Sequence, residues 1–209
     1  MRNQFFKHER KIIVGDTMTD ECWDSLLPST LQSLSPFQWT PISVIERTWK
    51  YLSSDGVTSV VDLGSGVGKF CIYLSLLFSD SIDIFGFEDR EELLSVSEGL
   101  KKHWGVSKVQ FQKANFLTHF PYGHSHYYCF NPLYETIKGS HSIDLKKNKS
   151  AHQFLKDLQT FKQNLFLLKP KSKLITFHGF GGSFLPGFRL VLNEEISGGE
   201  FQVWEKENT

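Results

Sequence analysis

The chain has 209 residues, of which 40% are hydrophobic, and its 23 basic and 23 acidic side chains give a formal net charge of zero. This length and apolar content fit one folded domain with its own core and exclude a disordered chain. A net charge of zero excludes a strong overall field that would attract nucleic acid or an anionic membrane.

Targeting signals and cysteine spacing restrict the class of protein further. The amino terminus carries charged residues where a signal peptide needs an apolar segment, and no apolar run approaches the roughly 18 residues of a membrane span. The cysteines, Cys22, Cys71 and Cys129, lie far apart, without the spacing of a metal site or a disulfide framework. The sequence therefore predicts a cytoplasmic protein that has no metal site and no contact with a membrane.

The first part of the chain is expected to be an extension to the main domain. Residues 1–37 have partly helical character and are expected to form an N-terminal segment on the substrate side, ahead of a domain over 38–209. The first helix of that domain is predicted over Ile42–Leu52, where apolar residues recur at helical spacing. Thr40 and Pro41, just before it, are a suitable cap and first-turn pair.

The most informative stretch is the run VVDLGSGVGKF, from Val60 to Phe70. An apolar, β-branched segment ends in Asp62, glycines follow at alternate positions, and a helix-like segment continues to Phe78. A strand that turns through glycines into a helix leaves backbone N–H groups and a positive helix end facing one pocket. Small residues there let a ligand contact the main chain. The run therefore predicts a site for a nucleotide-like ligand.

Three classes of ligand use glycine loops of this kind. A nucleoside triphosphate loop, G-x-x-x-x-G-K-[ST], fits poorly, because its first glycine falls on Leu63 and its final hydroxyl on Phe70. The dinucleotide pattern G-x-G-x-x-G places its third glycine on Lys69, so a nicotinamide dehydrogenase stays only an alternative. The pattern that is present, D-x-G-x-G-x-G, resembles the first motif of the class I S-adenosylmethionine-dependent methyltransferases.

The two strands that follow carry residues in keeping with this resemblance. A second strand over 82–87 ends at Glu88, where a carboxylate can accept hydrogen bonds from both hydroxyls of a ribose. A third strand over 108–112 leads to Asn115 and Phe116, which loosely match the family's adenine-reading pair. The resemblance implies S-adenosylmethionine as cofactor and S-adenosylhomocysteine as product. The residues that it implies for cofactor binding are Thr40, Asp62, Gly64, Ser65, Gly66, Gly68, Lys69, Glu88, Asn115, Phe116 and Asn131.

The fourth apolar run ends in a tetrapeptide that indicates the acceptor. Tyr127–Phe130 is followed by Asn131-Pro132-Leu133-Tyr134, which resembles the N-P-P-Y segment of methyltransferases that act on nitrogen. The resemblance implies catalytic roles for Asn131, Pro132 and Tyr134, whose polar groups would orient the target nitrogen. Leu133 departs from the pattern, which puts a planar nucleobase substrate in doubt more than methyl transfer itself.

The remaining elements predict the fold class. A helix is predicted over 151–168, a strand over 173–177, and an antiparallel hairpin over 189–195 and 200–205. Alternating strands and helices predict an α/β protein with helices on both faces of a parallel sheet. The resemblance implies a three-layer sandwich with a mostly parallel seven-stranded sheet of order 3-2-1-4-5-7-6, strand 7 being antiparallel. The terminal hairpin distinguishes this fold from the dinucleotide-binding folds.

The expected reaction is methyl transfer to nitrogen, with a protein lysine or a small amine as the acceptor. Phe116, Phe130 and Tyr134 would form an aromatic wall, and Tyr134, Glu135 or His178 could accept the proton that the amine loses. The loop around Lys146–Lys149 would help to shape the acceptor site. The chain lacks a basic stripe or an added nucleic-acid module, which argues against methylation of RNA or DNA. That activity and an inactive cofactor-binding module remain the alternatives.

Overall fold

The computed structural model describes residues 18–137, 139, 140, 143 and 149–208. Residues 1–17, and Lys146–Asn148 of the expected acceptor loop, lie outside these ranges. In chain order the elements are α1 (Asp20–Asp24), α2 (Ser29–Gln32), α3 (Ser35–Gln38), α4 (Ile42–Asp55), β1 (Ser59–Leu63), α5 (Lys69–Leu77), β2 (Asp83–Glu88), α6 (Glu91–Trp104), β3 (Val109–Lys113), β4 (His126–Phe130), the 3-10 helix η1 (Tyr134–Thr136), α7 (Ala151–Phe166), β5 (Lys173–Phe177), β6 (Phe188–Ile196) and β7 (Gly199–Lys206).

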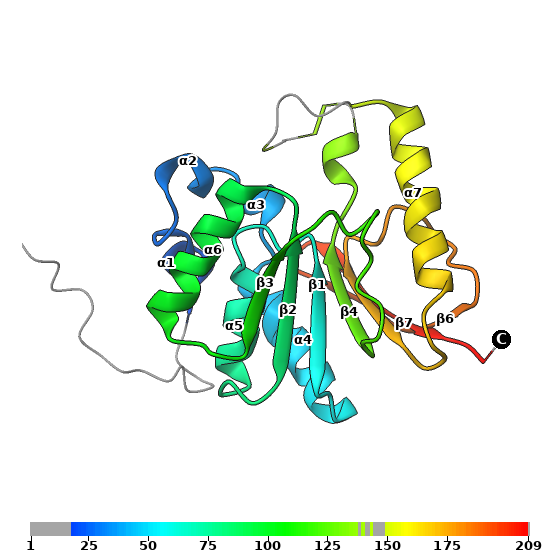
Figure 1. Cartoon of the computed structure of the whole chain (residues 1–209), viewed down its shortest axis with the longest axis horizontal. Coiled ribbons are helices and arrows are strands. Elements are labelled where there is room, and N and C mark those ends of the chain that lie inside the picture. Colours follow the sequence, from blue (N-terminus) through cyan, green and yellow to red (C-terminus); the bar gives the residue numbers. More distant parts are fainter. Residues whose placement is uncertain (1–17, 138, 141–142, 144–148, 209) are drawn as a thin grey trace, which may run out of the picture.

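The strands form one twisted sheet through the middle of the molecule (Figure 1). Their order is β3-β2-β1-β4-β5-β7-β6. Neighbours from β3 to β5 pair in parallel, whereas β7 pairs antiparallel with both β5 and β6. The predicted fold class, with its strand order and terminal hairpin, is therefore confirmed. The parallel order also places the carboxyl ends of β1, β2 and β4 along one edge of the sheet, where the predicted ligand residues lie.

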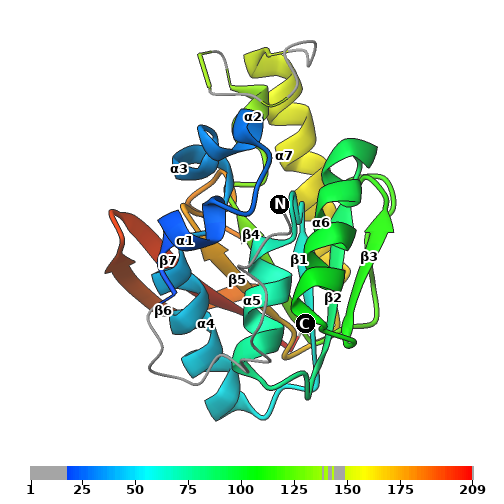
Figure 2. The ribbon, with the colours of Figure 1, turned by 90° about the vertical axis from the view of Figure 1, so that its left-hand side faces the viewer.

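Helices cover both faces of the sheet, and the core has two parts (Figure 2). Because side chains alternate along a strand, Val60 of β1 packs with α4, α5 and α6, whereas Val61 packs with Phe161 and Leu165 of α7. All four of these side chains are fully buried. Within the described ranges, no helix combines the length and the apolar character needed to cross a membrane.

The short N-terminal helices pack onto the α4–α6 side. Trp23 of α1 is fully buried and stacks on Trp104 of α6, with 5.6 Å between ring centroids. The cap expected from Thr40 is absent: Pro41 is the N-cap of α4 and makes no side-chain cap. Instead, Asp20 Oδ1 accepts the backbone N–H of Ile42 at 3.0 Å, so α1 caps the start of α4.

Candidate functional site

A cavity of about 320 Å³ lies at the carboxyl ends of β1, β2 and β4. This volume is at the lower end of the range for small-molecule sites. Residues from the glycine loop, the end of β2, the segment after β3, the end of β4, α3 and α7 line it. The predicted site residues that line it are Gly64, Gly66, Glu88, Asn115, Phe116, Asn131, Pro132 and Tyr134. The structure thus brings both halves of the predicted site, cofactor and acceptor, to one cavity.

The glycine loop is held tightly against the end of β2. The N–H groups of Gly64 and Ser65 both donate to the carbonyl oxygen of Phe87 at 2.9 Å, and Gly66 N–H donates to Glu88 Oε2 at 3.0 Å. The loop therefore uses these N–H groups within the chain, where the sequence suggested that they would face a ligand. What it offers to the cavity is the bare glycine surface of Gly64 and Gly66.

Trp39 closes the loop on one side. Gly66 has a φ of +54°, and a Cβ there would stand 2.6 Å from Cζ3 of Trp39. The indole is 5% exposed, lines the cavity and lies next to the C-terminal end of α3. Only glycine fits at position 66, because both the backbone conformation and the indole exclude a side chain.

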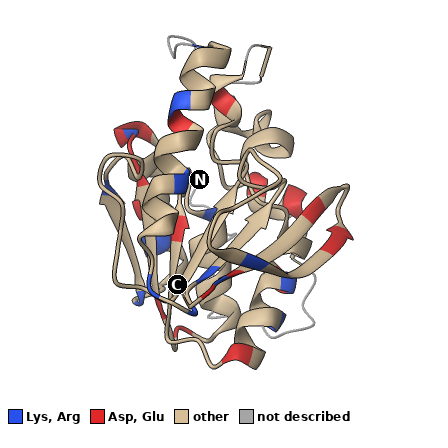
Figure 3. Cartoon of the chain, turned by 90° about the vertical axis from the view of Figure 1, so that its right-hand side faces the viewer, with Lys and Arg blue, Asp and Glu red and all other residues tan. Residues whose placement is uncertain are grey.

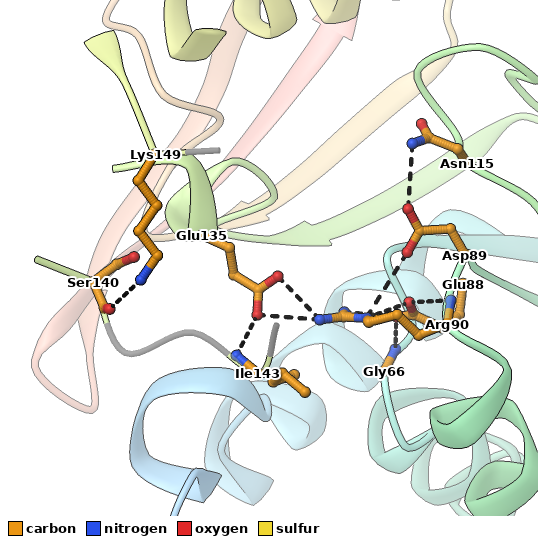
Figure 4. Close-up of polar contacts among 9 residues, drawn as sticks. All are labelled: Gly66, Glu88, Asp89, Arg90, Asn115, Glu135, Ser140, Ile143 and Lys149. Atoms are coloured by element: carbon orange, nitrogen blue, oxygen red, sulfur yellow. Dashed lines mark hydrogen bonds and ion pairs between the residues drawn. The ribbon is translucent and has the colours of Figure 1, made fainter. Parts of the chain in front are cut away.

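Two carboxylates of the cavity lining, Glu88 and Glu135, hydrogen-bond to one arginine (Figure 4), and a third, Asp89, has its Oδ1 3.8 Å from the Nε of that arginine. Nε and Nη2 of Arg90 donate to the two oxygens of Glu88 at 2.8 and 3.0 Å, and Nη1 donates to both oxygens of Glu135 at 3.1 and 3.0 Å. Burial raises the pKa of Glu88, but the hydrogen bonds and charge of Arg90 outweigh it and hold that pKa below the ordinary value. Glu88 is therefore ionised at neutral pH, as a ribose acceptor needs to be.

Asn115 and Phe116, which the resemblance places at the adenine, also line the cavity. Phe116 packs edge-on against Phe161 of α7, with 5.5 Å between centroids. Asn115 accepts the backbone N–H of Leu117 at 2.9 Å through its side-chain oxygen, and its amide nitrogen donates to Asp89 at 3.3 Å. Asn115 thus serves as a turn residue in this structure, while its side chain still borders the cavity.

Lys69, expected at the cofactor, points away from the cavity. Its side chain is 2% exposed, and its Nζ lies 2.6 Å from Asp20 Oδ1 and 3.1 Å from Asp24 Oδ1. This pairing neutralises a buried ammonium and fastens α1 to the first turn of α5. Lys69 is not among the residues that line the cavity.

Asp62, Thr40, Ser65 and Gly68 also lie behind the cavity lining. Asp62 accepts the thiol of Cys71 at 3.5 Å. Burial raises the pKa of Asp62 to about 7, against the opposing effect of the Cys71 hydrogen bond. Thr40 shares a buried hydrogen bond of 3.0 Å with the hydroxyl of Tyr128. Ser65 and Gly68 are buried in the loop, whose last glycine begins α5.

The part of the cavity where the sequence places the acceptor is formed by the segment after β4 together with α7. Asn131 has a φ of +40°, a left-handed backbone that is uncommon outside glycine and marks candidate functional positions. Pro132, Tyr134 and Phe130 line the same wall. All three aromatic residues expected there, Phe116, Phe130 and Tyr134, therefore reach the cavity. His178, also expected near this edge, has a φ of +58°, packs on Phe130 and does not belong to the cavity lining.

Several lining residues carry no signal in the sequence. Gln153 and Asp157 of α7 face the Asn131 wall, and Gln153 Nε2 donates to Asp157 Oδ1 at 2.8 Å. Arg90, two residues after Glu88, reaches back into the site. The ionic residues on the lining are Glu88, Asp89, Arg90, Glu135 and Asp157, so carboxylates outnumber cations there.

Comparisons with known proteins identify the fold. No family model and no curated protein matches the chain. An RNA methyltransferase from Salinibacter ruber, solved with S-adenosyl-L-homocysteine, matches at a TM-score of 0.59 and 17% identity over 81% of this chain and 94% of that one. MtNAS, solved with S-adenosylmethionine, matches at 0.57 and 11% identity over 89% and 70%. TehB from Haemophilus influenzae matches at 0.54 and 11% identity over 85% and 66%. At such identities the likeness establishes the class I methyltransferase fold.

Proposed function

We propose that the protein is an S-adenosylmethionine-dependent methyltransferase that transfers a methyl group to nitrogen, with S-adenosylhomocysteine as product. The observation that carries this proposal is the shared cavity: a bare glycine surface and Glu88 on one wall, Asn131 and Tyr134 on the other. The strand order is that of class I methyltransferases, and two of the matching structures contain the cofactor or its product.

The cofactor half divides into contacting and supporting residues. We assign direct contact to Gly64, Gly66, Glu88, Asn115, Phe116 and Asn131, which line the cavity. Glu88 would accept the ribose hydroxyls, and Phe116 would pack on the adenine ring. Thr40, Asp62, Ser65, Gly68 and Lys69 would act from behind, by fixing the loop that the cofactor contacts.

The acceptor half would align the nucleophile and remove its charge. The bound cofactor supplies a methyl group on a positive sulfur. Asn131 and Pro132 offer amide and carbonyl oxygens to orient a nitrogen lone pair, and correct alignment contributes several kcal/mol, about 7 in favourable cases. A lysine-type amine must first lose a proton, at a cost of about 4.6 kcal/mol at pH 7. Partial burial reduces that cost, and Tyr134 or Glu135 could accept the proton.

The charge of the cavity supports an amine acceptor. In the part of the chain that the structure describes, the cavity lining carries four carboxylates, Glu88, Asp89, Glu135 and Asp157, against one cation, Arg90, which is already bound by Glu88 and Glu135. A cationic amine is attracted to such a lining, and a phosphate is repelled. A protein lysine or a small amine is therefore the proposed acceptor. The N-terminal segment 1–37 and the loop around Lys146 are proposed to shape its approach.

A second candidate is an RNA acceptor. Matching structures include an RNA methyltransferase and a putative rRNA methylase, which favours this candidate at the level of the fold and runs against the expectation that nucleic acid is not a partner. Among the described residues on the side of the molecule in Figure 3, acidic and basic positions are interspersed, without a continuous basic strip. Binding of RNA that weakens steeply with added salt would support this candidate over the amine.

Calorimetry followed by a transfer assay tests the proposal. S-adenosylhomocysteine is titrated into the protein, and methyl-labelled cofactor is then incubated with protein and cell lysate. We expect binding, and label in a protein or amine fraction that resists ribonuclease. Binding without transfer to any fraction would support the alternative of an inactive module. The absence of binding would contradict the cofactor assignment, and label confined to oxygen or carbon would contradict the preference for nitrogen.

A further inference from the structure

Arg90 uses the acceptor capacity that a ribose would need. Oε1 of Glu88 accepts the backbone N–H of Arg90 at 3.0 Å and its Nε at 2.8 Å. Oε2 accepts Gly66 N–H at 3.0 Å and Arg90 Nη2 at 3.0 Å. A carboxylate offers about four lone-pair sites, and four donors fill them here. In this conformation Glu88 has no lone pair left for a ribose hydroxyl.

Only two of these four donors can leave. The N–H groups of Gly66 and Arg90 belong to the backbone, and the glycine loop and the end of β2 fix them. The other two belong to the guanidinium, whose side chain is 26% exposed. A ribose has two hydroxyls, which could replace these two guanidinium donors. Glu88 would then accept four hydrogen bonds both before and after the exchange.

The guanidinium also has a second anchor. Nη1 donates to both oxygens of Glu135, whose Oε1 in addition accepts the backbone N–H of Ile143 at 2.9 Å (Figure 4). Arg90 can therefore leave Glu88 and still be paired with a carboxylate. The cost of an unpaired guanidinium is thus avoided, whereas Glu88 would exchange its ionic partner for neutral hydroxyl donors.

We propose that Arg90 occupies the ribose-binding position of the free protein and that cofactor binding transfers it wholly to Glu135. This inference rests on the proposed function, because it takes Glu88 as the ribose acceptor. Arg90 is then a positioning residue that links the two halves of the cavity. With the cofactor site filled, Glu135 would hold the guanidinium, whose Nε in the present arrangement also lies 3.8 Å from Asp89 Oδ1.

The competition predicts a weakened affinity in the wild-type protein. If Glu88 is free in about a tenth of the molecules, the apparent Kd for the cofactor is about tenfold higher than the intrinsic one. Removing the guanidinium should lower the apparent Kd to its intrinsic value. Weakening the bond between Arg90 and Glu135 should raise the apparent Kd, because Arg90 would then stay on Glu88.

Calorimetric titrations of S-adenosylhomocysteine into four proteins test the inference. Relative to wild type, we expect Arg90→Ala to bind about tenfold more tightly and Glu135→Gln to bind more weakly, about threefold. Arg47→Ala is the matched control, because Arg47 pairs in the same two-point manner with Glu194, at 2.7 and 2.9 Å, between α4 and β6. It should leave the affinity unchanged. The 2′,3′-dideoxy counterpart of the ligand, which lacks both hydroxyls, should bind Arg90→Ala and wild type equally.

The outcomes separate this inference from the proposed function. If wild type binds and a folded Arg90→Ala binds equally or more weakly, the inference is wrong and the cofactor assignment stands. If neither protein binds, both are wrong. If Arg90→Ala does not fold, a crystal structure of wild type with S-adenosylhomocysteine decides. Ribose oxygens in place of Nε and Nη2 on Glu88 would support the exchange, and an unmoved guanidinium would overturn it.

Discussion

The two walls of the cavity are built in different ways. The wall from β1 and β2 comes from one continuous stretch of about 30 residues, and its polar groups are paired with one another before any ligand arrives. The opposite wall joins the end of β4 to α7, which lies some 20 residues further along the chain. Its backbone contains a left-handed Asn131, and carboxylates border it. The first wall is held in place by its own hydrogen bonds, and the second is the one that we propose to carry the chemistry.

The largest expected effect concerns a group behind the first wall. The folded-state pKa of Asp62, about 7, lies above its ordinary value of 3.8. Its contribution to stability is therefore fully present below about pH 3.8 and is lost as the pH rises through about 7. The difference in free energy of unfolding between wild type and Asp62→Asn should change by on the order of 4 kcal/mol across this window. Urea unfolding of both proteins from pH 4 to 8 measures this difference. If the difference stays constant with pH, the raised pKa of Asp62 is wrong.

Filling the glycine loop should damage both stability and binding. In Gly66→Val, a β-branched residue would adopt a left-handed backbone and meet Trp39, at a cost of about 3 kcal/mol. Gly56→Ala is the control, because Gly56 also has a positive φ but nothing lies within 4 Å of its Cβ position. It should cost only about 1 kcal/mol. Urea unfolding and calorimetry compare the two, and normal cofactor affinity in a folded Gly66→Val would argue against the loop assignment.

A change on the second wall should affect the rate more than the affinity. Asn131→Gly removes the amide but suits the left-handed backbone, so the fold should be at least as stable as wild type. We expect methyl transfer to fall about 100-fold, which corresponds to about 2.7 kcal/mol, and cofactor affinity to fall only about threefold through the loss of one contact. Single-turnover assays with labelled cofactor measure the rate. If cofactor affinity falls by as large a factor as the rate, Asn131 acts mainly in binding the cofactor, and the proposed difference between the two walls is wrong.

The smallest effect tests a supporting residue. Thr40→Val leaves the hydroxyl of Tyr128 without its buried partner and should cost about 1 kcal/mol of stability without a change in cofactor affinity. Tyr128→Phe in the same chain should recover part of that loss, because both polar groups are then gone. Thermal unfolding of the single and double variants gives the coupling. A weaker affinity in Thr40→Val alone would instead indicate a direct contact with the cofactor.

The sequence predicted the fold more completely than it predicted the site. The bounds of β1 and β5 follow from patterns within short segments, which local propensity and alternation determine, whereas the order of the strands was implied by the family resemblance. The direction of a side chain depends on what surrounds it in three dimensions. Lys69 turns to α1 because Asp20 and Asp24 lie there, and no spacing rule connects those residues. The same is true of Asp157, which reaches the cavity only through the packing of α7.

The pairing of Lys69 with α1 bears on where the chain can be shortened. Removal of residues 1–24 would leave the buried ammonium of Lys69 without its two carboxylate partners. It would also remove Asp20, whose carboxylate caps the start of α4. We therefore expect α1, which lies in the segment that the sequence assigned to an N-terminal extension, to be needed for folding. A shortened version of the protein should keep it.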